Sequence, residues 1–163
     1  MNNNEENICC PPFNPEPWEE KTNRWENKLF IKNSIPQIFH MPFPSAVEKM
    51  IQKLWEKAEE ANAAPDMKDF LLLTYDLSPW RSEFYMAVTK PVTDAETVTL
   101  SGTFVTKVFD GPYNHVPKWI KEMDTFLAQK NLSSEKYYFY FTTCPKCAKK
   151  YGHNYAVVFA QTE

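Results

Sequence analysis

The strongest pattern in the chain is an apolar stripe at helical spacing that begins at Val47 and ends at Ala58. Its apolar positions fall at offsets 0, 3, 4, 7, 8 and 11, and Glu and Lys fill the opposite face. This spacing is typical of an amphipathic helix that packs on a core. Ser45 is placed to be the N-cap, and Glu48 three residues later completes a capping box. We expect this helix to end before Pro65, because proline breaks a helix interior.

A second stripe of the same kind begins at Val116, with apolar residues at offsets 0, 3, 4, 7, 10 and 11, and Asn131 is placed to end that helix. Strand-like runs surround the two predicted helices. The predicted strands are residues 29–32, 37–41, 70–75, 83–90, 97–109, 136–143 and 155–161.

These elements follow the order strand, helix, strand, strand, and that order occurs twice. We therefore predict an α+β fold with a duplicated unit, an antiparallel sheet and two long helices on one side. Residues 1–27 are predicted to form an irregular arm, because the string CCPPFNPEPW holds four prolines in ten residues. Trp18 and Trp25 indicate that the arm packs on the body. The body is residues 28–163, divided into pseudo-repeats 28–92 and 93–163.

Composition narrows the function classes. The chain has 163 residues, a net charge of -3, 15% aromatic residues, 13 prolines and 3 glycines. An acidic balance argues against nucleic-acid binding, which needs a basic face. No GxGxxG or GxxxxGK[ST] string is present for a phosphate loop. The polar, acidic start resembles no signal peptide, and the apolar runs are too short for a membrane span, so a cytoplasmic protein without membrane contact is expected.

The predicted strand 83–90 has two distinct faces. Because side chains alternate along a strand, one face carries Glu83, Tyr85, Ala87 and Thr89, and the other carries Phe84, Met86 and Val88. If the second face meets the helices, Glu83 and Tyr85 face the open side. In the same way Tyr138 and Tyr140 share one face of the strand 136–143.

Together these residues predict an aromatic pocket. Trp80, just before the strand, and Tyr113, in the turn before the second helix, are placed to form its walls. Rings of this kind suit a cation or a flat, hydrophobic polycyclic molecule. The alternative interpretation is that the aromatic residues only fill cross-strand pairs.

One stretch, TLSGTFVTKVFDGPYNHVPKWIKEMDTFLAQKNL, resembles the hallmark of GyrI-like small-molecule-binding domains: a strand, a Gly-Pro-Tyr turn and a helix with a Trp. SPWRSEFYMAVTKPV resembles the preceding strand of that family and YYFYF the following one, so that the similarity covers residues 28–161. The resemblance implies the fold of the SOUL/GyrI superfamily, with a cleft for apolar, cationic or planar small molecules.

The strings CCPPF and CPKC resemble one branch of that family, the cyclopropanoid cyclopropyl hydrolases. This resemblance implies a hydrolase that opens the strained cyclopropane of DNA-alkylating natural products and so detoxifies xenobiotics. The final strand departs from the family, because HNYAVVFAQ holds no carboxylate before Gln161. From its place on the aromatic strand face, Glu83 is assigned to orient or deprotonate the attacking water, and a tyrosine hydroxyl, assigned to Tyr140, donates a hydrogen bond to the oxygen that gains charge. Desolvation among the rings is expected to raise the pKa of Glu83.

The expected ligand contacts are rings on several predicted elements. They are Trp80, Tyr85, Tyr113, Tyr138, Trp18 and Trp25. The alternative function is a module that binds or sequesters a small molecule without turnover, or that inhibits a partner protein as gyrase inhibitors do. An acid next to a tyrosine hydroxyl favours the enzyme, and a pocket of rings alone favours the binder. No feature favours haem binding, and the natural ligand and oligomeric state stay open.

The cysteines form two pairs, Cys9 with Cys10 and Cys144 with Cys147. Four thiolates can complete a tetrahedral structural zinc site, with His153 as a substitute ligand. Reduced cysteines without a metal are the equal alternative, because a cytoplasmic protein rarely holds disulfides. Redox chemistry ranks third, since the βαβ context of such a CxxC motif is missing. No cofactor is required for the predicted function.

Overall fold

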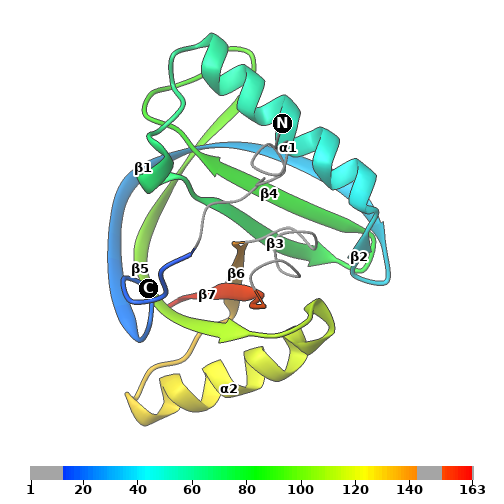
Figure 1. Cartoon of the computed structure of the whole chain (residues 1–163). Coiled ribbons are helices and arrows are strands. Elements are labelled where there is room, and N and C mark those ends of the chain that lie inside the picture. Colours follow the sequence, from blue (N-terminus) through cyan, green and yellow to red (C-terminus); the bar gives the residue numbers. More distant parts are fainter. Residues whose placement is uncertain (1–12, 143–151, 163) are drawn as a thin grey trace, which may run out of the picture. The chain divides into compact units, whose positions relative to one another are not determined.

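The structure is a computed structural model that describes residues 13–142 and 152–162. Its α-helices are α1 (Pro44–Glu60) and α2 (Val116–Gln129), and its strands are β1 (Lys21–Ile38), β2 (Met41–Pro42), β3 (Leu72–Ser78), β4 (Arg81–Ala87), β5 (Glu96–Asp110), β6 (Lys136–Phe141) and β7 (Tyr155–Gln161). Short 3-10 turns occupy Met67–Asp69 and Tyr113–His115. The predicted order of strand, helix, strand, strand is confirmed twice along the chain (Figure 1).

The described residues form two compact units, and each is described by itself. One unit is residues 24–102. The other joins residues 13–23 to residues 103–142 and 152–162. Both units are α+β, because each packs one helix on antiparallel strands.

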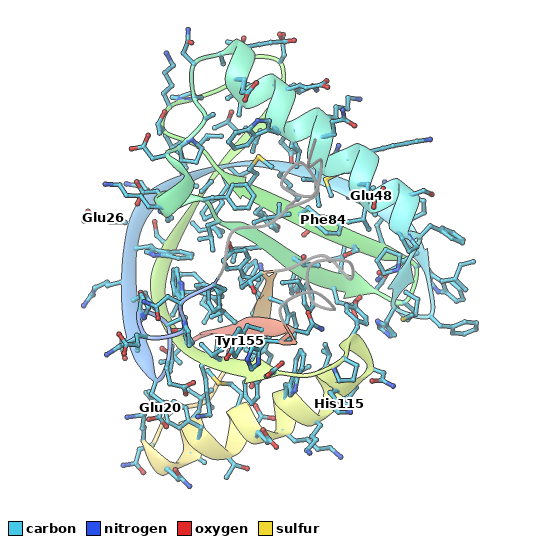
Figure 2. All side chains as sticks on the ribbon, viewed as in Figure 1. Glu20, Glu26, Glu48, Phe84, His115 and Tyr155 are labelled. Carbon is cyan, nitrogen blue, oxygen red and sulfur yellow. The ribbon has the colours of Figure 1, made fainter. Side chains whose placement is uncertain are left out.

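In the unit 24–102, antiparallel pairing places the strands in the order β2, β1, β4, β3. The helix α1 buries Met50, Leu54 and Ala58 against the strands. Phe84 and Met86 of β4 meet this apolar stripe, and Figure 2 shows Phe84 on the side of the strand near α1. The predicted stripe of the first helix is therefore the face that builds this core.

The start of α1 differs from the prediction. Its N-cap is Phe43, without a side-chain hydrogen bond, and Pro44 is the first helical residue. Proline suits that position because its fixed φ is helical and its missing N–H needs no partner there. The predicted cap Ser45 therefore lies inside the first turn, and its capping box with Glu48 does not form. The backbone carbonyl of Phe43 instead accepts the N–H groups of Ala46 and Val47, both at 3.0 Å.

In the other unit, β7 lies between β6 and β5 in an antiparallel arrangement. The helix α2 buries Trp119, Met123 and Leu127 against Phe139 of β6 and Val158 of β7. Period-two alternation then leaves the opposite face of these strands for other contacts. Among the described helices, none combines the length and apolarity needed to cross a membrane.

The predicted arm is irregular only in part. Residues 13–20 contain turns, but β1 begins at Lys21, so residues 21–27 are strand. This segment, KTNRWEN, is polar and shows no apolar alternation that would indicate a strand. It is held by residues far away in sequence, as when the Ser101 hydroxyl accepts the backbone N–H of Asn27 at 2.8 Å. The local sequence pattern therefore does not indicate this pairing.

Candidate functional site

The two faces of β4 confirm the predicted alternation. Phe84, Met86 and Val88 belong to the core under α1. Glu83 and Tyr85 therefore lie on the face directed away from that helix. The site begins on this second face, where neighbouring strands add side chains of both polar and aromatic character.

Both carboxylate oxygens of Glu83 have partners within the unit 24–102. The hydroxyl of Tyr85 donates a hydrogen bond to Oε1 at 2.8 Å, and Nζ of Lys32 forms an ion pair with Oε2, also at 2.8 Å. The side chain of Glu83 is 12% exposed and that of Lys32 is 27% exposed. Strand register explains the ion pair. Lys32 of β1 lies opposite Tyr85 and therefore diagonal to Glu83 on the same face.

Aromatic rings support this polar group. The Lys32 ammonium lies 5.8 Å from the centroid of the Tyr85 ring, within cation–π range. Phe30 meets Tyr85 edge to face at 6.4 Å, and Trp25 lies 5.8 Å from Phe30. We call Glu83, Tyr85, Lys32, Phe30 and Trp25 the Glu83 cluster. It joins three residues that the sequence singled out with two that sequence reasoning missed, namely Lys32 and Phe30.

The surroundings of Glu83 contain more polar partners than the sequence indicated. Sequence reasoning considered only the loss of water around the carboxylate. The structure adds a lysine ion pair and a hydrogen bond from a phenol, one to each carboxylate oxygen. These two contacts hold the side chain of Glu83 in a fixed position on the strand face.

A cleft of about 420 Å³ lies next to the Glu83 cluster in the same unit. Lys32 belongs to both, and its ammonium lies 3.8 Å from Oε2 of Glu96 in the cleft wall. Opposite, Lys57 of α1 donates to the backbone carbonyl of Asp94 at 2.7 Å. The full lining is Lys32, Asn33, Lys53, Leu54, Lys57, Thr93, Asp94, Ala95 and Glu96. This cleft is polar, unlike the aromatic pocket predicted from the sequence.

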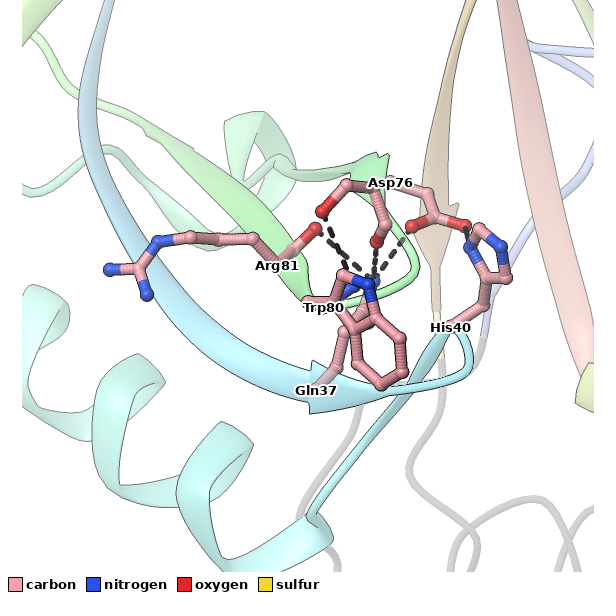
Figure 3. Close-up of polar contacts among 6 residues, drawn as sticks. Gln37, His40, Asp76, Trp80 and Arg81 are labelled. Carbon is pink, nitrogen blue, oxygen red and sulfur yellow. Dashed lines mark hydrogen bonds and ion pairs between the residues drawn. The ribbon is translucent and has the colours of Figure 1, made fainter.

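Trp80 lies in the turn between β3 and β4, where it is 56% exposed. Its ring packs on Phe39 of the β1–β2 turn at 5.1 Å. Figure 3 shows how the two turns are joined: the buried side chain of Gln37 donates to Asp76 and to two backbone carbonyls, at 2.7 to 3.1 Å. Trp80 therefore belongs to an aromatic pair at the surface, and its ring contact is to Phe39 rather than to a member of the Glu83 cluster.

The second unit holds the remaining predicted rings. Tyr138 is fully buried and packs on Phe104 at 6.1 Å, on the face of β6 directed away from α2. Tyr140 shares that face and meets Phe13 at 6.3 Å. Trp18 packs edge to face on Phe159 at 5.3 Å. Phe159 of β7 is the cross-strand partner of Tyr138. These rings form one continuous layer on the strands.

Tyr113 lies on the other face of the same strands. It is 38% exposed in the turn before α2 and packs on Phe141 at 5.2 Å. Phe141 packs with the core under α2, as does Phe139. Within this unit, Tyr113 is therefore separated by the strands from the layer that contains Tyr138 and Tyr140.

The four cysteines proposed as zinc ligands, Cys9, Cys10, Cys144 and Cys147, lie outside the described residues. His153, the proposed substitute ligand, stacks on Tyr155 at 4.9 Å, and its Nδ1 lies 3.0 Å from Oδ2 of Asp110. Within residues 13–142 and 152–162, no group of three or more His, Cys, Asp or Glu side chains is arranged to hold a metal.

The sequence profile of the family described as "Bacterial hydrolase" matches residues 1–162. The chain belongs to the bacterial hydrolase family. No curated protein is similar to this bacterial hydrolase family member in sequence.

Solved structures of the same fold extend this result. A hydrolase from Listeria innocua superposes with a TM-score of 0.65 and 11% identity, over 98% of this chain and 96% of that one. The EcmrR C-terminal domain superposes with a TM-score of 0.66 and 11% identity, over 90% of this chain and 98% of that one. SAV2435, solved with tetraphenylphosphonium bound, superposes with a TM-score of 0.53 and 9% identity, over 89% of this chain and 94% of that one. These similarities show the fold alone, which is the GyrI-like fold that the sequence resemblance implied.

Proposed function

We propose that this member of the bacterial hydrolase family hydrolyses hydrophobic, electrophilic small molecules of the cyclopropanoid type. The observation that carries the proposal is the Glu83 carboxylate, 12% exposed and held by Tyr85 and Lys32 on an aromatic strand face. Family membership supports hydrolysis as the reaction class. The tetraphenylphosphonium bound to SAV2435 supports an aromatic small molecule as the ligand class.

The proposed step is the addition of water to a three-membered ring. Glu83 accepts a proton from water while the water oxygen forms a bond to the ring CH2 carbon. The ring C–C bond breaks, and its electron pair passes through the conjugated system to a carbonyl oxygen, which becomes a phenolate and then takes up a proton. The product is heavier than the substrate by one water, and relief of ring strain lowers the barrier.

The proposed step uses groups within the unit 24–102. The hydroxyl of Tyr85 donates a hydrogen bond to Oε1 of Glu83, so Tyr85 positions the base. Tyr140, which the sequence assigned to the oxygen that gains charge, belongs to the other unit and is given no role in this step. The partly exposed ring of Trp25, which packs on the fully buried Phe30, offers flat apolar surface to a polycyclic substrate.

One observation favours a second function, binding without turnover. Both oxygens of Glu83 are engaged by side chains of the same unit. A carboxylate used in this way is also a stable structural feature of a pocket that only sequesters its ligand. The two functions differ in the fate of the compound, so one assay separates them.

The test mixes the purified protein with a cyclopropanoid DNA-alkylating compound and follows the mass of the compound. We expect a product heavier by one water, and Glu83→Gln is expected to slow its formation by about 100-fold or more, since this substitution removes the base. Glu48→Gln, on the exposed face of α1, is the matched control (Figure 2). Full turnover by Glu83→Gln contradicts the assignment, and a bound but intact compound supports the sequestering function.

A further inference from the structure

The Glu83 cluster carries its own cation. Two features normally draw a hydrophobic cation into an aromatic site, a carboxylate and the face of an electron-rich ring. Here Lys32 meets both from within the chain. Its Nζ lies 2.8 Å from Oε2 of Glu83 and 5.8 Å from the centroid of the Tyr85 ring.

Backbone pairing holds this cation in place. Lys32 and Tyr85 are directly opposite each other on β1 and β4. The flanking cross-strand pair joins Ser34 to Glu83, so that the lysine reaches Glu83 diagonally along the same face. The cation is therefore built into the strand register rather than contributed by a flexible surface loop.

Glu83 is a stronger carboxylate partner of Lys32 than Glu96 is. Glu96 lies 3.8 Å from the Lys32 ammonium, but its side chain is 63% exposed and is screened by water and salt. The side chain of Glu83 is 12% exposed and lies at 2.8 Å, so the ion pair with Lys32 offsets the negative charge that would otherwise attract a cation to it.

We propose that Lys32 is a specificity-determining residue, an internal counter-ion that makes the Glu83 site select uncharged polycyclic ligands over hydrophobic cations. This inference rests on the site of the proposed function and names its ligand class. SAV2435 was solved with tetraphenylphosphonium bound, so this hydrophobic cation is a suitable probe for the preference. An uncharged aromatic ligand leaves the Lys32–Glu83 pair intact, whereas a cation must displace it or accept a neutralised site.

The experiment compares two probes of related shape, tetraphenylphosphonium and uncharged triphenylphosphine oxide, by equilibrium dialysis at pH 8. The wild type is expected to bind the cation no more tightly than the neutral probe. Lys32→Met keeps the apolar stem and removes the charge, so it is expected to raise the affinity for the cation by about tenfold or more. The affinity for the neutral probe is expected to stay within about threefold of the wild-type value.

Three further variants make the result specific. Lys32→Arg keeps the charge and should keep the wild-type preference. Lys53→Met removes an exposed lysine from the cleft wall and should leave the ratio of the two affinities unchanged. Lys32→Gln gives a second neutral variant that should repeat the effect of Lys32→Met, with circular dichroism confirming that each variant is folded.

The proposal is overturned if the wild type binds tetraphenylphosphonium tenfold more tightly than the neutral probe and both neutral variants show the same ratio. A failure of every protein to bind either probe also overturns it. The assay involves no turnover, which separates it from the test of hydrolysis. If the neutral variants change the preference but the wild type does not hydrolyse the compound, the specificity role of Lys32 stands and the enzymatic function is refuted. If the wild type hydrolyses the compound but the variants leave the preference unchanged, the enzymatic function stands and the role of Lys32 is refuted.

Discussion

Asp110 shows how a surface carboxylate is tuned by its neighbours. Its Oδ1 accepts the backbone N–H of Asn154 at 2.8 Å, and Oδ2 lies 3.0 Å from Nδ1 of His153. Burial by itself raises the pKa of Asp110, but these hydrogen bonds and the charge of His153 outweigh burial and lower the pKa below 3.8. The charged form is therefore favoured in the folded chain.

This lowered pKa predicts a loss of stability in acid. The contribution of the Asp110 carboxylate to the free energy of unfolding is fully present above its ordinary pKa of 3.8 and is lost as the pH falls through the lower folded value. The difference in free energy of unfolding between wild type and Asp110→Asn should therefore shrink between pH 5 and pH 2. Urea titrations at each pH measure it, and Glu122→Gln on the exposed face of α2 is the control. A constant difference across this range would contradict the account.

Other residues show the limit of reasoning from residue type alone. Glu83 was selected because it is an acid on an aromatic strand, and the structure places it with Tyr85 as expected. Lys32 carried no such signal, since a lysine in a strand most often faces water. Its alternation with Phe30 on the same face of β1 was the available clue, and that clue needs the strand register to become informative.

At the scale of elements, both helices end in the same way. After α1, the N–H of Asn62 bonds to the carbonyl of Glu59 and that of Ala63 to Ala58. After α2, the N–H of Asn131 bonds to Ala128 and that of Leu132 to Leu127. Both asparagines have a left-handed backbone, with φ of 53° and 58°. These are Schellman motifs, in which an asparagine takes the position usually given to glycine.

The motif predicts the effect of changes at Asn131. Asn131→Val places a β-branched side chain at positive φ and should lower the free energy of unfolding by about 1–2 kcal/mol. Asn131→Gly removes the strain and should be neutral or slightly stabilising. Lys130→Val, at an exposed neighbour with φ of -102°, is the control, because a valine is not strained there. Chemical denaturation checks all three, and equal losses at both positions would refute the role of the left-handed cap.

The beginnings of the helices were less predictable than their ends. Ser45 and Glu48 have the spacing of a capping box, yet α1 begins one residue before Ser45. Pro44 decides this, because proline is preorganised for the first helical turn and competes with the serine cap. The apolar stripes, by contrast, placed the bodies of both helices correctly, since a helical period summed over several turns outweighs one end signal.

At the scale of the whole molecule, the segment 13–20 packs on the strands of its own unit. Within its unit, the Thr106 hydroxyl donates to the carbonyl of Trp18 at 2.7 Å. The ammonium of Lys107 lies 3.0 Å from Oε1 of Glu19. Burial alone lowers the pKa of Lys107, but its bond to Glu19 and the nearby acids outweigh burial and raise it. Apolar and polar contacts thus hold the segment on the strands.

These contacts predict different costs for two tryptophans. Trp18→Ala should lower the free energy of unfolding by about 2–3 kcal/mol, because it removes a half-buried ring packed on Phe159. Trp80→Ala removes a ring that is 56% exposed and should cost about 1 kcal/mol or less. The second variant controls for the chemistry of the substitution. Equal costs by urea denaturation would show that the segment contributes nothing to the core of its unit.

The sequence by itself determined the class of fold, the two helix stripes and the face on which Glu83 lies. Those features depend on the periods of 3.6 and 2 residues that local backbone geometry imposes. Only the tertiary structure decided that Lys32 pairs with Glu83, that β1 begins at Lys21, and that Trp80 lies at the surface against Phe39. Each of these depends on which strands pair and in which register, and a shift of one residue would turn every side chain to the other face.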